Sequence, residues 1–132
     1  MKDFRKQKVW EESHQLTLAI YEASEEFPRE ELYGLTSQIR RASSSIPANI
    51  AEGCGKNGEA ELARFFQIAR GSPSELEYHL LLARDLDFLP VSEYERLTKE
   101  LGEIRRMLAS FIKKLKTHSS KLKAQGSKPK GT

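Results

Sequence analysis

The amino-acid sequence predicts an all-α protein, an antiparallel up-and-down four-helix bundle with kinks near Pro47 and Pro73. Three observations support this fold class. Apolar residues recur at helical spacing in four segments, short breaks separate these segments, and no segment shows the apolar and polar alternation of a half-buried strand. A chain of 132 residues is also long enough to bury one core without disulfides.

The first helix is expected to end near Pro28. Its apolar seam has a 4-3-4-3-4 spacing and consists of Val9, Ser13, Leu16, Ile20, Ala23 and Phe27. The segment PREELYG then forms a short connection, where Gly34 is free to adopt a backbone conformation that other residues avoid.

Residues 35–52 are predicted to form a second helix with two neighbouring stripes. The apolar stripe consists of Ile39, Ala42, Ser43, Ile46 and Ile50. The other, here called the polar stripe, consists of Gln38, Arg41, Ser45, Asn49 and Glu52. Pro47 removes the amide bond back toward Ser43, so a bend is expected in this helix.

The polar stripe is predicted to have partners. An unpaired buried polar group costs about 1–3 kcal/mol, so these side chains should satisfy one another or a neighbouring subunit. We expect Arg41 to pair with Glu52 or with another acid across a helix or subunit junction. Helical spacing alone does not choose between these arrangements.

The segment GCGKNG, residues 53–58, is predicted to be a loop that leads to a third helix ending near Leu86. The sequence from Ser72 to Glu75 resembles a new helix start, with Pro73 at the first position, yet a single long kinked helix is favoured.

The fourth helix follows the connection DFLP, and Ser92 and Glu95 have the spacing of a capping box at its start. It carries the most regular apolar seam of the chain, formed by Tyr94, Leu97, Leu101, Ile104, Leu108, Phe111 and Leu115. Short connections between four such helices place sequential helices antiparallel.

Charge is distributed unevenly along the chain. Residues 1–112 contain 15 lysines and arginines against 19 acids, whereas residues 113–132 contain seven lysines and no acid. We therefore predict a bundle domain at residues 1–117 and a flexible basic tail at residues 118–132. Such a tail increases encounter with RNA, DNA or another acidic surface, and a merely solvated tail is the alternative.

The sequence contains no convincing catalytic constellation, so we expect a protein that is not an enzyme. The only cysteine, Cys54, excludes an internal disulfide and is expected to be an unreactive loop thiol. GCGKNG lacks the Lys and Ser or Thr of a phosphate-binding loop. Only Glu11 and His14 have the Glu-x-x-His spacing of a carboxylate-bridged metal bundle, so no metal or cofactor is predicted.

The N-terminal sequence MKDFRKQKVW lacks the apolar core of a signal peptide. No apolar run approaches the roughly 18 to 20 residues that cross a bilayer. The sequence therefore predicts a cytoplasmic protein without a membrane partner.

Basic side chains are the candidates for contact with nucleic acid, because guanidinium groups form forked contacts with phosphate as well as with carboxylate. The predicted nucleic-acid-binding residues are Arg40, Arg105, Arg106, Lys113, Lys114 and Lys116. A solvated helix face is the alternative for those on the fourth helix, and Arg40 lies outside the polar stripe.

The order of motifs resembles the four-helix bundle proteins encoded in intervening sequences of bacterial large-subunit ribosomal RNA genes. The resemblance covers about Phe4 to Lys116. It is carried by KVWEESHQL, FPREELYGLTSQIRRASSSIPANIAEG, ARFFQIARGS, ELEYHLLLARDL and the final helix with EIRRML. Pro73 and the lysine-containing segment after Lys116 depart from the family pattern.

The resemblance implies a compact up-and-down bundle that assembles as a cyclic homo-oligomer, with a pentamer as first choice. It also implies a relationship to the bundle-shaped accessory proteins of diversity-generating retroelements, which bind a reverse transcriptase and nucleic acid. The leading hypothesis is a non-enzymatic oligomeric scaffold that binds RNA or a nucleoprotein. The rival is a protein-interaction adaptor, such as an accessory subunit of a reverse transcriptase, without RNA affinity of its own.

Overall fold

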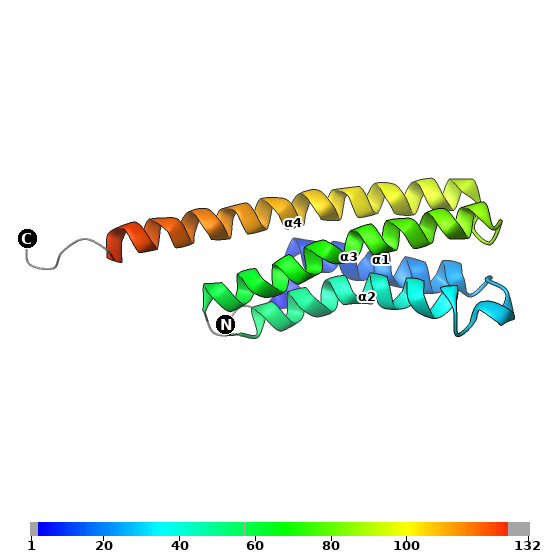
Figure 1. Ribbon diagram of the computed structural model, residues 1–132, viewed down its shortest axis with the longest axis horizontal. Helices are drawn as coiled ribbons and strands as arrows, with labels where there is room; N and C mark the ends of the chain where they lie inside the picture. The colour runs from blue at the N-terminus through cyan, green and yellow to red at the C-terminus, as the bar shows by residue number, and fades with distance from the viewer. Residues whose placement is uncertain (1–2, 57, 127–132) are drawn as a thin grey trace, which may run out of the picture.

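The computed structural model describes residues 3–56 and 58–126, with side chains up to residue 118. The regular elements in these ranges are all helical, which confirms the predicted fold class. They are the 3-10 turns η1 (Phe4–Lys6) and η2 (Arg29–Glu31) and the helices α1 (Lys8–Ser24), α2 (Leu35–Cys54), α3 (Glu59–Asp85) and α4 (Val91–Gly126). Figure 1 shows the four helices side by side along one long axis, with short connections at alternating ends.

Each helix packs against two neighbours, so that α1 contacts α2 and α4, and α3 contacts the same two helices. The core between them is apolar and follows the seams expected from the sequence. Its largest fully buried side chains are Phe66, Leu16, Ile20, Ile39, Ile46, Ile50, Leu76, Leu80, Leu97, Leu101, Ile104 and Leu108. Burial of such side chains supplies the main favourable term in folding, at about 1.5–3 kcal/mol each.

Pro47 is buried inside α2 without ending the helix. As proline has no amide hydrogen, the carbonyl of Ser43 loses its usual partner one turn later. The hydroxyl of Thr17, on α1, lies 3.1 Å from that carbonyl oxygen and 2.9 Å from the carbonyl oxygen of Ser13. A side chain of the neighbouring helix thus satisfies the acceptor that the proline leaves open.

Pro73 is likewise buried within α3, which runs as one helix from Glu59 to Asp85. The single long helix favoured from the sequence is therefore confirmed, and the alternative start at Ser72 is not used. The bends expected at the two prolines stay predictions.

Two local predictions are wrong. Helix α2 continues through Gly53 to Cys54, both of which are buried against the core instead of lying in a loop. Helix α4 starts at Val91, where the amide of Tyr94 donates to the carbonyl of Pro90. Ser92 therefore lies in the first turn, and its side chain forms no capping bond with the residues that the structure describes.

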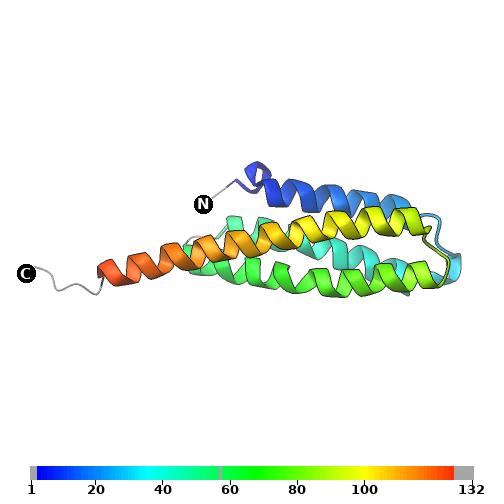
Figure 2. The ribbon, with the colours of Figure 1, turned by 90° about the horizontal axis from the view of Figure 1, so that it is seen from above.

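Helix α4 continues to Gly126, past residue 117, and projects beyond the ends of the other three helices (Figures 1 and 2). Residues 118–126 of the predicted tail are thus helical, and residues 127–132 lie outside the described ranges. The division into a bundle domain and a tail stays a prediction. Within the described residues, no helix is both long and apolar enough to span a bilayer.

Candidate nucleic-acid interface

A groove lies between the start of α1 and the second half of α4. Its volume is about 430 Å³, and we call it the basic groove. It is lined by Gln7, Lys8, Val9, Arg106, Met107, Ser110, Phe111 and Lys114. Apolar side chains thus form its floor and cations its rim. A second hollow of about 420 Å³ shares Ser110 and Lys114 and adds Lys113, Thr117 and His118.

The cations of the two adjoining hollows are exposed and are not neutralised by the described residues. Lys8, Arg106 and Lys114 of the basic groove, and Lys113 of the second hollow, form no ion pair with a carboxylate there. At neutral pH they therefore present four uncompensated positive charges along one strip of α4 and the start of α1. Such a strip attracts a polyanion, and its attraction falls as salt increases.

The structure brings only part of the predicted nucleic-acid set together. Arg106, Lys113 and Lys114 line the two adjoining hollows, whereas Lys116 is exposed outside both. Arg105 turns toward α3, where its Nη2 donates to the Glu77 carboxylate at 2.6 Å. Arg105 therefore joins α4 to α3.

Arg40 is also engaged within the chain. Its Nε donates to the Ser24 hydroxyl at 2.7 Å, its Nη2 donates to the Tyr21 carbonyl at 3.2 Å, and its guanidinium stacks 4.7 Å from the centre of the Tyr21 ring. The Tyr21 carbonyl lies in the last turn of α1, where carbonyls lack partners within the helix. Arg40 thus caps the C-terminal end of α1 from α2.

The groove residues at the start of α1, which are Gln7, Lys8 and Val9, are absent from the set expected from the sequence. The signal that identifies them is topological. In an up-and-down bundle of four helices, the first helix starts beside the second half of the last one. Lysines near the start of α1 therefore join the basic residues of α4 in space, although about 100 residues separate Lys8 from Arg106 in the chain.

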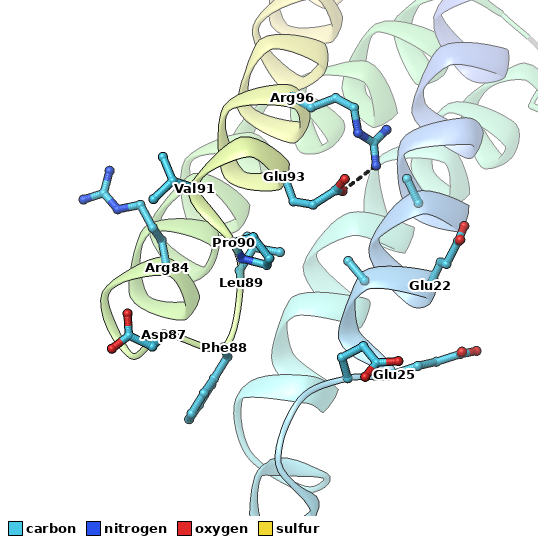
Figure 3. A pocket seen from close by; sticks show the side chains of 13 residues that line it. Glu22, Glu25, Arg84, Asp87, Phe88, Leu89, Pro90, Val91, Glu93 and Arg96 are labelled. Atoms are coloured by element: carbon cyan, nitrogen blue, oxygen red, sulfur yellow. Dashed lines mark hydrogen bonds and ion pairs between the residues drawn. The ribbon is translucent and has the colours of Figure 1, made fainter.

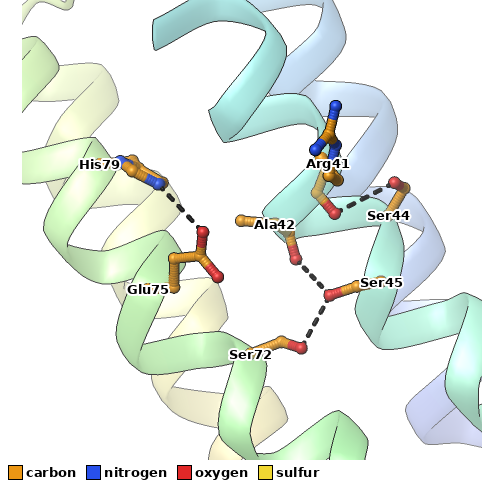
Figure 4. Close-up of polar contacts among 7 residues, drawn as sticks. All are labelled: Arg41, Ala42, Ser44, Ser45, Ser72, Glu75 and His79. Carbon is orange, nitrogen blue, oxygen red and sulfur yellow. Dashed lines mark hydrogen bonds and ion pairs between the residues drawn. The ribbon is translucent and has the colours of Figure 1, made fainter.

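Ser45, in the middle of the polar stripe, contacts α3 and is satisfied within the chain (Figure 4). The hydroxyl oxygens of Ser45 and Ser72 are 2.7 Å apart, and the Ser45 hydroxyl also donates to the Ala42 carbonyl at 2.9 Å. The side-chain amide of Asn49 donates to the Ser45 carbonyl at 2.7 Å. The bond between Ser45 and Ser72 joins α2 to α3, whereas the other two bonds lie within α2.

The outer members of the polar stripe are exposed. Glu52 forms a 3.3 Å ion pair with Lys56, one turn further along the chain, instead of with Arg41. The side chains of Gln38 and Arg41 have no hydrogen bond or ion pair with the described part of the chain. An exposed, unpaired guanidinium is available for a carboxylate of another molecule.

The described ranges contain no site for metal binding, and the cysteine and histidine considered below are buried. They contain no group of three or more His, Cys, Asp or Glu side chains arranged to hold a metal ion. Cys54 is buried at the end of α2 and does not lie in the loop expected from the sequence. His79 is buried and lies 3.4 Å from the Glu75 carboxylate on the same helix (Figure 4).

These features define the class of the protein, an up-and-down four-helix bundle with a basic groove at one end and a polar stripe along one side. The family model described as 23S rRNA-intervening sequence protein matches residues 5–110. The chain belongs to this family.

A solved structure agrees with this assignment. The chain is similar to a protein of the S23 ribosomal protein family from Bacteroides thetaiotaomicron, whose function is described as unknown. The two sequences are 27% identical, the match covers 80% of this chain and 95% of the other, and the TM-score is 0.73. A search of curated proteins found no match.

Proposed function

We propose that the protein is a non-enzymatic cytoplasmic scaffold that assembles as a homo-oligomer and binds RNA, alone or in a nucleoprotein, in the basic groove. The observation that carries the proposal is the set of unpaired cations around an apolar floor. Lysines and arginines contact phosphates, while the partly exposed Met107 and Phe111 offer a surface for the faces of unpaired bases.

Assembly into an oligomer would raise the affinity for RNA above that of a single groove. Each copy supplies a few phosphate contacts, and a ring with several grooves holds one RNA at several points, which raises the effective concentration at each point. We propose a pentamer as the first choice, with Arg41 and the rest of the polar stripe at the subunit junction. The exposed, unpaired state of Arg41 and Gln38 supports that role.

RNA binding is tested by a salt series with full-length protein and a labelled single-stranded RNA. The variant Arg106→Gln with Lys114→Gln removes two groove cations. The expected result is weaker binding and a slope of log affinity against log salt that is smaller by about 1.4, since each phosphate contact on a single strand contributes about 0.7.

The matched control is Arg29→Gln with Arg70→Gln, which removes the same charge from exposed positions outside the groove. It should keep the wild-type slope. Equal losses in both double variants would show a diffuse attraction instead of a groove, and salt-insensitive or absent binding by the wild type would reject the proposal.

The second candidate is a protein-interaction adaptor that has no RNA affinity and uses the polar stripe, for example as an accessory subunit of a reverse transcriptase. The exposed, unpaired side chains of Gln38 and Arg41 on the polar stripe favour it. Copurification of a protein partner that is lost with Arg41→Glu but kept with the groove variant would support this candidate over RNA binding.

A further inference from the structure

The opposite end of the seam between α1 and α4 contains a cleft of about 730 Å³ (Figure 3). Its apolar lining consists of Ala19, Ala23, Phe88, Leu89, Pro90 and Val91. Its carboxylates are Glu22, Glu25, Glu26, Asp87 and Glu93. We call this hollow the acidic cleft, and it lies at the end of the bundle away from the basic groove.

Most of the negative charge in the acidic cleft is unbalanced. Arg96 is held by Glu93 at 2.7 Å and by Glu100 at 3.3 Å, and the hydrogen bond to Glu93 and these charges raise the pKa of Arg96. Arg84 pairs with Asp85 and points away from the α1 side of the cleft (Figure 3).

Four of the cleft's carboxylates form no ion pair within the described residues: Glu22, Glu25, Glu26 and Asp87. A ligand that suits this site combines cationic groups with an aliphatic surface. Lysine has both, since its four-carbon stem packs on apolar side chains while its ammonium group stays with carboxylates at the rim.

The chain itself contains a segment of this chemistry, because residues 113–132 contain seven lysines and no acid. That segment cannot reach the cleft of its own copy. Helix α4 runs from the cleft at Val91 to Gly126, a length of about 54 Å. The six residues after Gly126 span at most about 21 Å when fully extended. The lysine-rich segment can therefore reach this cleft only when segment and cleft belong to two different copies of the chain.

We propose that the lysine-rich end of one copy, residues 118–132, docks in the acidic cleft of a second copy. The contact is head to tail, since it joins two different surfaces of the two molecules. Such a contact repeats into chains unless its geometry closes a ring. It is separate from the proposed RNA binding and needs no nucleic acid.

A mixing experiment with nuclease-treated, full-length protein tests the proposal. The cleft variant carries Glu22→Gln, Glu25→Gln and Glu26→Gln. The tail variant carries Lys121→Gln, Lys123→Gln, Lys128→Gln and Lys130→Gln. Fluorescence-detected sedimentation velocity is measured on each variant alone and on labelled tail variant mixed with unlabelled cleft variant.

Wild-type protein is expected to show a concentration-dependent association that weakens at high salt. Each variant alone should associate about tenfold more weakly, as expected for the loss of several exposed ion pairs. The mixture should restore association, because the intact tail of one variant meets the intact cleft of the other.

The charge-matched control is Glu11→Gln, Glu12→Gln and Glu103→Gln, which changes three carboxylates outside the cleft that form no ion pair within the described ranges. It should associate like the wild type. The proposal is overturned if the cleft variant, folded by circular dichroism, associates as tightly as wild type, if the control weakens association equally, or if mixing restores nothing. Glu25→Lys is a second cleft variant, for use if the triple variant does not fold.

Discussion

At the scale of single residues, Thr17 resolves a conflict within the sequence of α2. Pro47 lies on the buried side of the helix, where its ring packs, but it withdraws the amide that the Ser43 carbonyl needs. Thr17 provides a hydroxyl from the neighbouring helix at 3.1 Å. A single proton is shared between two carbonyls there, so the bond to Ser43 stabilises the native state by less than a full hydrogen bond.

Replacing Thr17 with valine keeps the shape but removes the hydroxyl. We expect Thr17→Val to lower the free energy of unfolding by about 1–2 kcal/mol, because a buried carbonyl loses its partner. In a Pro47→Ala background the helix supplies its own amide, so the same change should cost less. Urea denaturation of the four proteins measures this coupling, and an equal cost in both backgrounds would contradict the role of Thr17.

Adjacent arginines on α2 have different roles. Arg40 caps α1 and is half-buried, whereas Arg41 is exposed and unpaired within the described chain. We expect Arg40→Gln to lower the free energy of unfolding by about 1–3 kcal/mol, since it removes two interhelical hydrogen bonds. Thermal denaturation of Arg40→Gln and Arg41→Gln measures the difference, and equal melting temperatures would count against the capping role.

For assembly, the expected order of the two arginines is reversed, with Arg41 more important than Arg40. We expect Arg41→Glu to reduce the mass of the oligomer more than Arg40→Glu does, because a reversed charge at the proposed junction repels its acidic partner. Light scattering after size-exclusion chromatography measures the masses. Two variants with the wild-type mass would argue against the polar stripe as a subunit junction.

At the scale of elements, the end of α2 shows where sequence patterns fail. Gly53 and Cys54 belong by composition to a turn, yet both are helical and buried. The reason is a close approach to α3. A Cβ atom on Gly53 would lie 3.0 Å from the Cβ of Phe65 and 3.3 Å from the Leu62 carbonyl oxygen. The glycine permits this helix contact, and the contact in turn favours the helical state of the glycine.

We expect Gly53→Ala to lower the free energy of unfolding by about 1–3 kcal/mol, because one helix must move away from the other. Gly71 is the matched control, since it lies in α3 and a methyl group added there would meet no atom within 4 Å among the described residues. Gly71→Ala should raise stability by about 0.5–1 kcal/mol through helix propensity alone. Chemical denaturation measures the free energy of unfolding of both variants. A Gly53→Ala variant as stable as the wild type, or more stable, would contradict a close approach of α2 and α3 at Gly53.

The apolar seams were predictable because each helix buries one stripe, and that stripe appears in the sequence as a repeat. The start of α2 at Leu35 and the continuity of α3 through Pro73 follow from the same local patterns. The start of α4 was not predictable in detail, since Ser92 and Glu95 fit a capping box that the tertiary structure does not use.

At the scale of the whole molecule, the two ends of the seam between α1 and α4 carry opposite charge. The basic groove contains Lys8 with cations of α4, and the acidic cleft contains carboxylates at and just after the end of α1 with few cations. Neither site can be predicted from one segment of the sequence, because each site combines residues that are far apart in the chain. The sequence predicted the cations of α4 but not their neighbours, nor that Arg40 and Arg105 bind within the bundle.

The proposed function requires RNA to bind in the basic groove. Ultraviolet crosslinking of the full-length protein to a single-stranded RNA, followed by mass spectrometry of the crosslinked peptides, locates the bound RNA. Binding in the groove predicts crosslinks in residues 7–9 and in the stretch 106–114, which contains the residues of α4 that line it. Crosslinks confined to the exposed side of α2 and α3, or none above the level of a non-binding control protein, would contradict the claim.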